Sequence, residues 1–305
     1  MPIKLFQCPP AQKEGGKKLH TFDYCLNKCT NMCTPRPVLS VMVNEQETNH
    51  HSGSHISVTS LQHCIRQVYL ERTEDYAIEP KFGIWQSLRG TLIHAMFETP
   101  SEPDRFLCEV DYVYEFNGIK VHGRLDMYDK VDRILYDFKT QNDFGYLRTL
   151  KNQAAKEDHV WQTNFYRYLL EKGIHVPKKY EKPLGNFPVD KIVIIYMSMQ
   201  SVLGTDTEVY EYDNRTGKVN LYAMADVPLL SHAKIRSYVR PRAAILDRAF
   251  RTGTIPAPTQ NPDDHRWLCG FGYKNFRGYC AVRSKCEFWR KAADEEGIGY
   301  DEKSQ

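Results

Sequence analysis

Hydrophobic and polar positions in the middle of the chain alternate as they do in strands that bury one face. The runs 106–116 and 120–127 are rich in β-branched and aromatic residues, and an Asn-Gly dipeptide at 117–118 joins them, as in tight hairpin turns. A third run, 133–140, follows a short turn at 129–132. The pattern therefore predicts a meander of three antiparallel strands.

Apolar residues at helical spacing flank this meander. Helices are predicted from Thr59 or Ser60 to about 70, over about 83–98 and from about 156 to a stop at Gly173. A fourth helix is predicted over much of 221–251, and Pro241 could interrupt it. Further strands are predicted over 191–199 and 208–212. For the helix over 83–98 we expect a buried face that includes Leu88, Leu92 and Met96.

The composition is that of an ordinary globular protein. Hydrophobic residues make up 41% and charged residues 26% of the 305 positions, and no stretch approaches the roughly 18 consecutive apolar residues that cross a bilayer. The formal net charge is only +3, although 234–251 and 273–291 are locally basic and interleaved with aromatic residues. The first residues lack the apolar segment of a secretory signal. We therefore expect a soluble, cytoplasmic protein.

Candidate chemistry lies in the second hairpin of the meander. If its turn is centred at 130–131, Asp126 lies opposite about Leu135. Residues two apart in a strand share a face, so Asp137 and Lys139 project to the same side as Asp126. Two carboxylates and an ammonium group therefore converge on one face of the predicted sheet.

Two carboxylates on one partly buried face repel each other unless a cation lies between them. Mg²⁺ or Mn²⁺ prefers such oxygen ligands and can polarise a phosphoryl oxygen or activate a water molecule. Lys139 would stabilise the developing charge or help to orient and deprotonate that water. The alternative is a cross-strand salt bridge on an exposed sheet, because Asp-x-Lys alone is common.

Two helices carry further polar residues that could serve the same site. His94 follows Gly90 by one helical turn, and the missing side chain of Gly90 could allow another element to pack closely. Gln162 and Tyr166 are four residues apart, so both polar groups can reach one site. Taken alone, His94 could equally be a core histidine, and the Gln/Tyr pair could be ordinary amphipathic packing.

The order of these motifs is more specific than any one of them. The chain contains, in order, Thr59-Ser60-Leu61, Cys64, Tyr69-Leu70, Gly90-x3-His94, Gly123-x2-Asp126, Asp137-Phe138-Lys139-Thr140 and Gln162-x3-Tyr166. This order resembles the RecB-type branch of the PD-(D/E)xK nuclease superfamily, over about 56–170 and again over 267–289.

The resemblance implies a role for each matching residue. The implied metal ligands are His94, Asp126, Asp137, the backbone carbonyl of Phe138 and, at an acidic position sometimes present on the preceding strand, Glu109. Lys139 would act at the attacking water. Gln162 and Tyr166 would contact the DNA backbone or support the lysine.

Nine cysteines fall into two groups, with Cys108 apart as a buried small hydrophobe. One cysteine before the core and three after it resemble the layout of iron–sulfur RecB-type exonucleases, including the CRISPR-associated exonuclease of that type: Cys64, Cys269, Cys280 and Cys286. Four thiolates suit a 4Fe-4S cluster. The ten residues between Cys269 and Cys280 depart from the usual C-x2-C spacing, and zinc on the same sulfurs is the alternative.

The other group of cysteines lies near the N-terminus. Cys25, Cys29 and Cys33 follow a C-x3-C-x3-C spacing, with Cys8 upstream. Four thiolates could bind Zn²⁺ and order a segment that has little core of its own. The alternative is that these are unremarkable thiols in a loop.

These observations predict an α/β protein with a restriction-endonuclease-like core, a central mixed sheet flanked by helices. The expected segments are a cysteine-rich appendage at 1–40, a linker at 41–55, the nuclease core at 56–252, a cluster-binding segment at 253–295 and a tail at 296–305. Arg277, Arg283 and Lys285 are candidate DNA contacts.

We expect a Mg²⁺- or Mn²⁺-dependent deoxyribonuclease, an exonuclease acting on single strands or DNA ends. Protein partners in DNA repair, recombination or CRISPR adaptation, and a prokaryotic or viral source, would fit such an enzyme. The alternative is a catalytically silent nucleic-acid-binding or assembly subunit.

Overall fold

The computed structural model divides the chain into two compact units. Unit 1 comprises 1–56, 63–88 and 242–305, and unit 2 comprises 57–62 and 89–241. The residues that the structure describes are 5–8, 19–30, 33–48, 56–78, 85–141, 149, 152–198, 212–213, 218–219, 222–258, 269 and 280–295.

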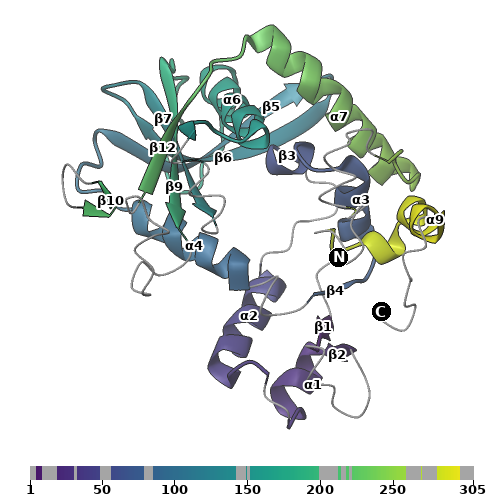
Figure 1. The fold of residues 1–305 in the computed structure, drawn as a ribbon. Coiled ribbons are helices and arrows are strands. Elements are labelled where there is room, and N and C mark those ends of the chain that lie inside the picture. The colour runs from purple at the N-terminus through teal and green to yellow at the C-terminus, as the bar shows by residue number, and fades with distance from the viewer. Residues whose placement is uncertain are drawn as a thin grey trace. The chain divides into compact units, whose positions relative to one another are not determined.

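Unit 2 is organised around a mixed sheet (Figure 1). Its main path runs β12-β9-β7-β6-β5-β8, with β3 (Ile56–Ser57) pairing with β6 off this path. The bounds are Phe106–Phe116 for β5, Ile119–Asp129 for β6, Ile134–Gln141 for β7, Ile174–His175 for β8, Lys191–Ser198 for β9 and Tyr222–Val227 for β12. Strands β7 and β9 are parallel and the other pairs on the path are antiparallel. The three-strand meander and the strand over 191–199 are thus confirmed.

The register of the β6–β7 hairpin differs from the predicted one. Met127 pairs with Tyr136 and Tyr128 pairs with Leu135, so Asp126 does not lie opposite Leu135. The predicted register was wrong by two residues, because the turn is centred one residue later than expected. An even shift preserves which residues share a face. The convergence of Asp126 and Asp137 therefore survives the correction.

Side-chain and backbone conformations fix the turns on either side of β6. Asn117 and Gly118 both have positive φ angles, 51° and 83°, as the favoured two-residue hairpin turns require. At the other end, the buried carboxylate of Asp129 accepts hydrogen bonds from the N–H groups of Val131 and Asp132 and from Nε of Arg105.

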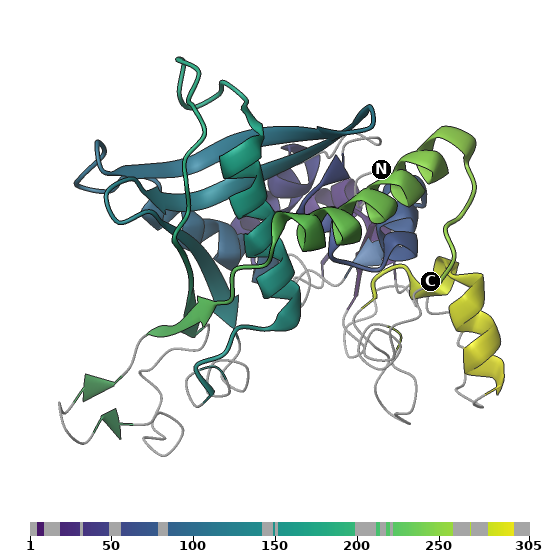
Figure 2. The same ribbon diagram turned by 90° about the horizontal axis from the view of Figure 1, so that it is seen from above.

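The central helix of unit 2 is α6 (Glu157–Lys172), which ends before Gly173 as predicted. It lies across strands β5 and β6 (Figures 1 and 2). Gly123 makes this approach possible, because a Cβ there would lie 2.5 Å from Cδ1 of Leu169 and 2.9 Å from Cγ2 of Val58. By contrast, among the described residues a Cβ at Gly90 would meet nothing nearer than Oγ1 of Thr140 at 4.0 Å, so they do not pack closely against Gly90.

Helix α4 (Trp85–Phe97) matches the predicted span but not the predicted buried face. Leu88 is buried, whereas Leu92 and Met96 are 61% and 72% exposed. The helix instead turns Phe97 toward the sheet, where its ring stacks on Phe138 with centroids 3.9 Å apart.

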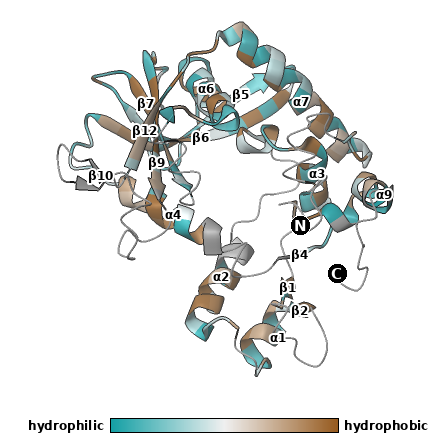
Figure 3. Ribbon diagram, in the orientation of Figure 1, coloured by the Kyte–Doolittle hydropathy of each residue, from teal (hydrophilic) through white to brown (hydrophobic). Residues whose placement is uncertain are grey.

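Helix α7 (His232–Thr252) continues through Pro241 without interruption. Hydrophobic and hydrophilic residues alternate around it along its whole length (Figure 3). The predicted helix over 221–251 began too early, because 222–227 form β12. Its buried residues alternate with exposed ones at a period of two, which is typical of an edge strand rather than a helix.

Unit 1 contains shorter elements. A small sheet has the order β2-β1-β4, from Leu19–Thr21, Leu5–Gln7 and Ala77–Ile78. Its helices are α1 (Phe22–Asn27), α2 (Arg36–Thr48), α3 (Ile65–Thr73) and α9 (Glu287–Glu295), with a short 3₁₀ turn at Arg283–Lys285. One core cluster consists of the buried residues Phe6, Leu39, Met42, Val43 and Leu88.

Two expectations about the N-terminal half need correction. The residues assigned to a linker, 41–55, include the end of α2, whose Met42 and Val43 are buried in the core cluster. The helix expected from Thr59 is divided into a 3₁₀ turn at Thr59–Leu61 and α3, which begins at Ile65.

Two further short strands, β10 (Tyr212–Asp213) and β11 (Lys218–Val219), pair with each other. Among the described residues, no helix combines the length and apolar character needed to span a bilayer.

Candidate functional site

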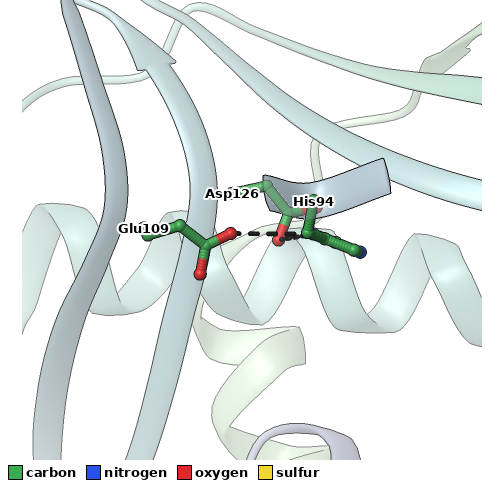
Figure 4. A group of neighbouring side chains, drawn as sticks. All are labelled: His94, Glu109 and Asp126. Atoms are coloured by element: carbon green, nitrogen blue, oxygen red, sulfur yellow. Dashed lines mark ion pairs between the residues drawn. The ribbon is translucent and has the colours of Figure 1, made fainter. Parts of the chain in front are cut away.

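A histidine and two carboxylates meet in unit 2 (Figure 4). Nδ1 of His94 on α4 lies 3.4 Å from Oδ1 of Asp126 on β6 and 3.6 Å from Oε1 of Glu109 on β5. One ligand atom from each residue lies within 4.8 Å of the others. Glu109, which the resemblance matched only to an occasional acidic position, therefore belongs to the group as closely as His94 and Asp126.

The backbone of β5 is distorted where it presents Glu109. Its φ angle is 53°, in the left-handed region, although glutamate has a Cβ. The neighbours Cys108 and Val110 pair regularly with Met127 and Leu125, so the distortion is confined to one residue. Such a conformation costs on the order of 1–3 kcal/mol and is typical of functional sites.

The two carboxylates hold a proton on His94. Its contacts with Asp126 and Glu109 outweigh burial and raise the pKa of His94 to about 10. Binding of a metal ion requires a neutral imidazole nitrogen, so the ion would replace this proton. The two carboxylates that stabilise the protonated histidine would then bind the ion.

Asp137 and Lys139 lie beside this group as an ion pair whose carboxylate is buried and whose ammonium is partly exposed. Nζ of Lys139 is 2.7 Å from Oδ2 of Asp137, which is 1% exposed. Neither carboxylate oxygen of Asp137 accepts a hydrogen bond of normal geometry from the described residues. Burial raises the pKa of Asp137 although Lys139 opposes the rise. Burial disfavours the ammonium as well, but Asp137 and Asp126 raise the pKa of Lys139.

These charges leave a deficit of positive charge. With His94 neutral, the described groups of the site, the carboxylates of Glu109, Asp126 and Asp137 and the ammonium of Lys139, leave two negative charges. Arg124 approaches Glu109 at 3.8 Å, but its guanidinium is exposed and lies nearer to Asp111, at 3.4 Å. A divalent cation would balance the site, and its oxygen-rich ligand set suits Mg²⁺ or Mn²⁺.

The hairpin itself orients Asp126. The backbone N–H of Phe138 donates to Oδ2 of Asp126 at 2.8 Å, just beyond the last ladder pair of β6 and β7. This bond leaves Oδ1 of Asp126 directed toward His94. The N–H of Phe138 thus has a defined part in the site, whereas the implied role of its carbonyl as a metal ligand stays a prediction.

Gln162 and Tyr166 form a buried pair on α6. Nε2 of Gln162 donates to the Tyr166 hydroxyl at 3.0 Å and lies 3.5 Å from Oγ1 of Thr59. Burial raises the pKa of Tyr166 to about 12, and the charge of Lys139 partly offsets the rise. The structure therefore brings Thr59, Gln162 and Tyr166 to the side of the site that holds Lys139.

A second polar pair near Lys139 was not predicted from the sequence. Tyr196 on β9 is fully buried and pairs in register with Lys139 on β7. Its hydroxyl lies 2.8 Å from Nδ1 of His159 in the first turn of α6. Burial lowers the pKa of His159 to about 4, so this histidine is neutral near Lys139. The i, i+3 spacing of His159 and Gln162 on one helix is the feature of the sequence that could have placed His159 on the same face as Gln162.

The four cysteines predicted to hold a cluster line one pocket in unit 1. It is lined by Cys64, Cys269, Cys280 and Cys286 together with Arg66, Gln67, Leu70, Pro258, Arg283, Phe288 and Trp289. Nε1 of Trp289 donates to the carbonyl of Cys269 at 2.7 Å, which ties that residue to α9. Burial raises the pKa of Cys280 to about 12, and Cys269 and Cys64 add to the rise. We call this the cysteine pocket.

The N-terminal cysteines lie in different surroundings. Among the described residues, no three of Cys8, Cys25, Cys29 and Cys33 place their sulfur atoms within 4.8 Å of one another. Cys25 packs partly against the core cluster of unit 1, and Cys33 is exposed. Zinc binding there stays a prediction. Cys108, as expected, is a buried member of the sheet core.

The candidate DNA contacts fall in different surroundings. Arg277 lies outside the described residues. Arg283 lines the cysteine pocket, with its guanidinium 5.9 Å from the centre of the Trp289 ring, and Lys285 belongs to the 3₁₀ turn next to Cys286. Their contact with DNA stays a prediction.

No family model matches the chain, and no curated protein matches it. Among solved structures, a protein named SSO0001 aligns with 82% of this chain and 94% of its own, at 17% identity and a TM-score of 0.45. A phage-related exonuclease from Haemophilus somnus 129PT aligns with 65% of this chain and 94% of its own, at 11% identity and a TM-score of 0.37. Likenesses as distant as these leave the assignment of a function to the site itself.

Proposed function

We propose that the chain is a metal-dependent nuclease that hydrolyses DNA phosphodiester bonds at the site formed by His94, Glu109, Asp126, Asp137 and Lys139. The observation that carries the proposal is the buried carboxylate of Asp137, which lies beside three further metal-ligand candidates. Its Oδ2 contacts the ammonium of Lys139, but its Oδ1 has no hydrogen-bond partner among the described residues. A buried oxygen in that state is costly unless a cation completes its surroundings.

The protein groups would divide the work of hydrolysis among them. A bound Mg²⁺ or Mn²⁺ would supply Lewis acidity toward a phosphoryl oxygen and a water nucleophile. Asp137 and Asp126 raise the pKa of the partly buried Lys139 and keep it protonated, so it can stabilise negative charge that develops on the phosphate. The Gln162–Tyr166 pair would limit the movement of Lys139 and offer polar contacts to the DNA backbone.

DNA is the proposed substrate, attacked at single strands or free ends. The alternative, a silent binding subunit, would have little need for a strained Glu109 or for a buried Asp137 whose Oδ1 has no partner among the described residues. Both features cost stability, and catalysis is the simplest reason to retain them.

The cysteine pocket suits an iron–sulfur cluster better than a single zinc ion. Tetrahedral zinc with bonds of about 2.3 Å places its sulfur ligands only about 3.8 Å apart. In the described part of the chain, no three of the sulfur atoms of Cys64, Cys269, Cys280 and Cys286 lie within 4.8 Å of one another, although all four line one pocket. A four-iron cluster holds its thiolates farther apart than a single ion does.

The nuclease proposal is tested by digestion of end-labelled single- and double-stranded DNA with Mn²⁺. We expect wild type to degrade DNA and Lys139→Ala to lose on the order of 10³-fold in rate. Lys120→Ala is the matched control, because Lys120 is an exposed lysine of the same hairpin. Equal degradation by wild type and Lys139→Ala, or none by either, would contradict the proposal.

Circular single-stranded DNA tests the mode of attack. An exonuclease needs an end, so we expect closed circles to survive under conditions that digest the linear form. Cleavage of circles at the same rate would show an endonuclease instead. Chemical analysis of iron and acid-labile sulfide tests the cluster independently, and stoichiometric zinc without iron would overturn it.

A further inference from the structure

Arg66 in the cysteine pocket contacts a predicted cluster ligand directly. Its Nη1 atom lies 3.6 Å from Sγ of Cys286, within hydrogen-bonding distance for sulfur. The same guanidinium donates from Nε to the backbone carbonyl of Pro256 at 2.7 Å. The Arg66 guanidinium therefore has two hydrogen-bond partners, which keep its charge beside the sulfur atom.

The position of Arg66 in the fold links two ligands. It follows Cys64 by two residues in the first turn of α3, so the helix that starts at one predicted ligand also carries the cation that reaches another. Its neighbour Gln67 also lines the pocket but donates to Glu71 at 2.7 Å. Arg66, unlike Gln67, therefore directs a donor at a sulfur atom.

We infer that Arg66 donates a hydrogen bond to the Cys286 thiolate of the cluster and makes that cluster easier to reduce. This inference rests on the proposed function, because it needs the cluster. Uptake of one electron from a one-electron donor adds one negative charge to the cluster and its thiolates. A fixed cation stabilises the reduced form more than the oxidised form, so the reduction potential rises.

A raised potential would give the cluster a second property beyond joining α3 to the C-terminal segment. Arginine keeps its charge at every pH of interest and offers its donors in a rigid plane, so the effect would be constant rather than pH-dependent. The cluster could then change its oxidation state while the protein remains folded.

The test is a redox titration of the anaerobically purified full chain, followed by visible absorbance and electron paramagnetic resonance. We expect Arg66→Gln to shift the midpoint to a more negative potential by about 59 mV, which is a tenfold change in the equilibrium constant for one electron. Arg66→Lys, which retains the positive charge without the planar guanidinium donors, should have a midpoint potential between those of wild type and Arg66→Gln. Arg290→Gln, an exposed position on α9, is the control and should leave the midpoint unchanged.

The outcomes separate this inference from the cluster itself. Wild-type midpoints in both Arg66 variants, with unchanged iron and sulfide content, would overturn the role of Arg66 and leave the cluster standing. Loss of iron from Arg66→Gln alone, with Arg66→Lys and Arg290→Gln still loaded, would support a cation requirement at Cys286. Wild-type protein without iron and sulfide would overturn the cluster first and this inference with it.

Discussion

The acidic site of unit 2 and the cysteine pocket of unit 1 are built in opposite ways. Apart from His94, the acidic site takes its charged residues from the neighbouring strands β5, β6 and β7, whose ladders fix the backbone. Cys64 lies far in sequence from the other three cysteines of the pocket, and none of the four lies in a strand. Backbone hydrogen bonds therefore preorganise the first site, whereas the second depends on whatever joins its segments.

The two sites should differ most in how much stability the protein loses when the cluster or the divalent ion is removed. We expect Cys280→Ala to lose iron and to destabilise the protein by on the order of 5 kcal/mol, because a shared cluster would stabilise the segments that hold it. Treatment of wild type with EDTA should remove the divalent ion and activity with a far smaller change in thermal unfolding. Calorimetry with iron analysis measures both effects.

Cys108→Ala is the matched control for this comparison. Cys108 is buried, as Cys280 is, but belongs to the sheet core of unit 2. It should keep iron and lose only about 1 kcal/mol from the smaller side chain. If both substitutions cost the same, the pocket has no cross-linking group and the contrast between the two units fails.

A second prediction tests whether packing preorganises the acidic site. We expect Gly123→Ala to cost about 1–3 kcal/mol, because the new methyl group would lie 2.5 Å from Cδ1 of the fully buried Leu169. The shift of α6 should also move Gln162 and Tyr166, so activity should fall with stability. Urea unfolding and DNA digestion measure the two effects.

Gly90→Ala provides the control, since in the described part of the chain its Cβ would approach only Oγ1 of Thr140, at 4.0 Å. In a helix interior, alanine is favoured over glycine by up to about 1 kcal/mol, so this variant should be as stable as wild type or more so. Equal losses at both glycines would mean that close packing at Gly123 is not what positions α6.

A third prediction concerns the strain at Glu109. Asparagine tolerates positive φ better than glutamate, and it removes one of the clustered carboxylates. We expect Glu109→Asn to stabilise the metal-free protein by about 1 kcal/mol while weakening Mn²⁺ binding at least tenfold. Thermal unfolding and calorimetric titration with Mn²⁺ would measure these changes. Glu115→Asn, at an exposed position of the same strand, should change neither quantity appreciably.

The sequence was most informative where local rules act. The Asn-Gly turn, the period-two alternation and the stop at Gly173 predicted the meander and α6, and the face shared by Asp126, Asp137 and Lys139 followed from strand geometry alone. Parity made that prediction robust, because a register error of two residues changes the partners but not the face.

The sequence was least informative where tertiary contacts determine which residues are buried or strained. Leu92 and Met96 have helical spacing but face outward, since the periodicity of a helix does not say which apolar stripe is covered. The strained φ of Glu109 has no signature in the sequence, and the spacing of His159 and Gln162 marks a helix face without showing that Tyr196 contacts it. The contact of Arg66 with Cys286 joins residues 220 positions apart, so it too could not be predicted from local sequence.

The smallest expected effect tests the turn that sets the β6–β7 register. Burial alone would raise the pKa of Asp129, but hydrogen bonds from Arg105 and from the N–H groups of Asp132 and Val131 lower it below its ordinary value. A lowered folded-state pKa stabilises the fold above the unfolded value near 4, and the contribution is lost as the pH falls through the folded value. We expect Asp129→Asn to cost roughly 1 kcal/mol at pH 7.

That difference in unfolding free energy between wild type and Asp129→Asn should shrink as the pH is lowered below about 4. Urea unfolding at a series of pH values measures it. Asp190→Asn, which removes an exposed ion pair with Arg133, should cost less than about 0.5 kcal/mol throughout. A constant penalty for Asp129→Asn down to pH 3 would mean that the shape of the side chain, rather than its charge, holds the turn.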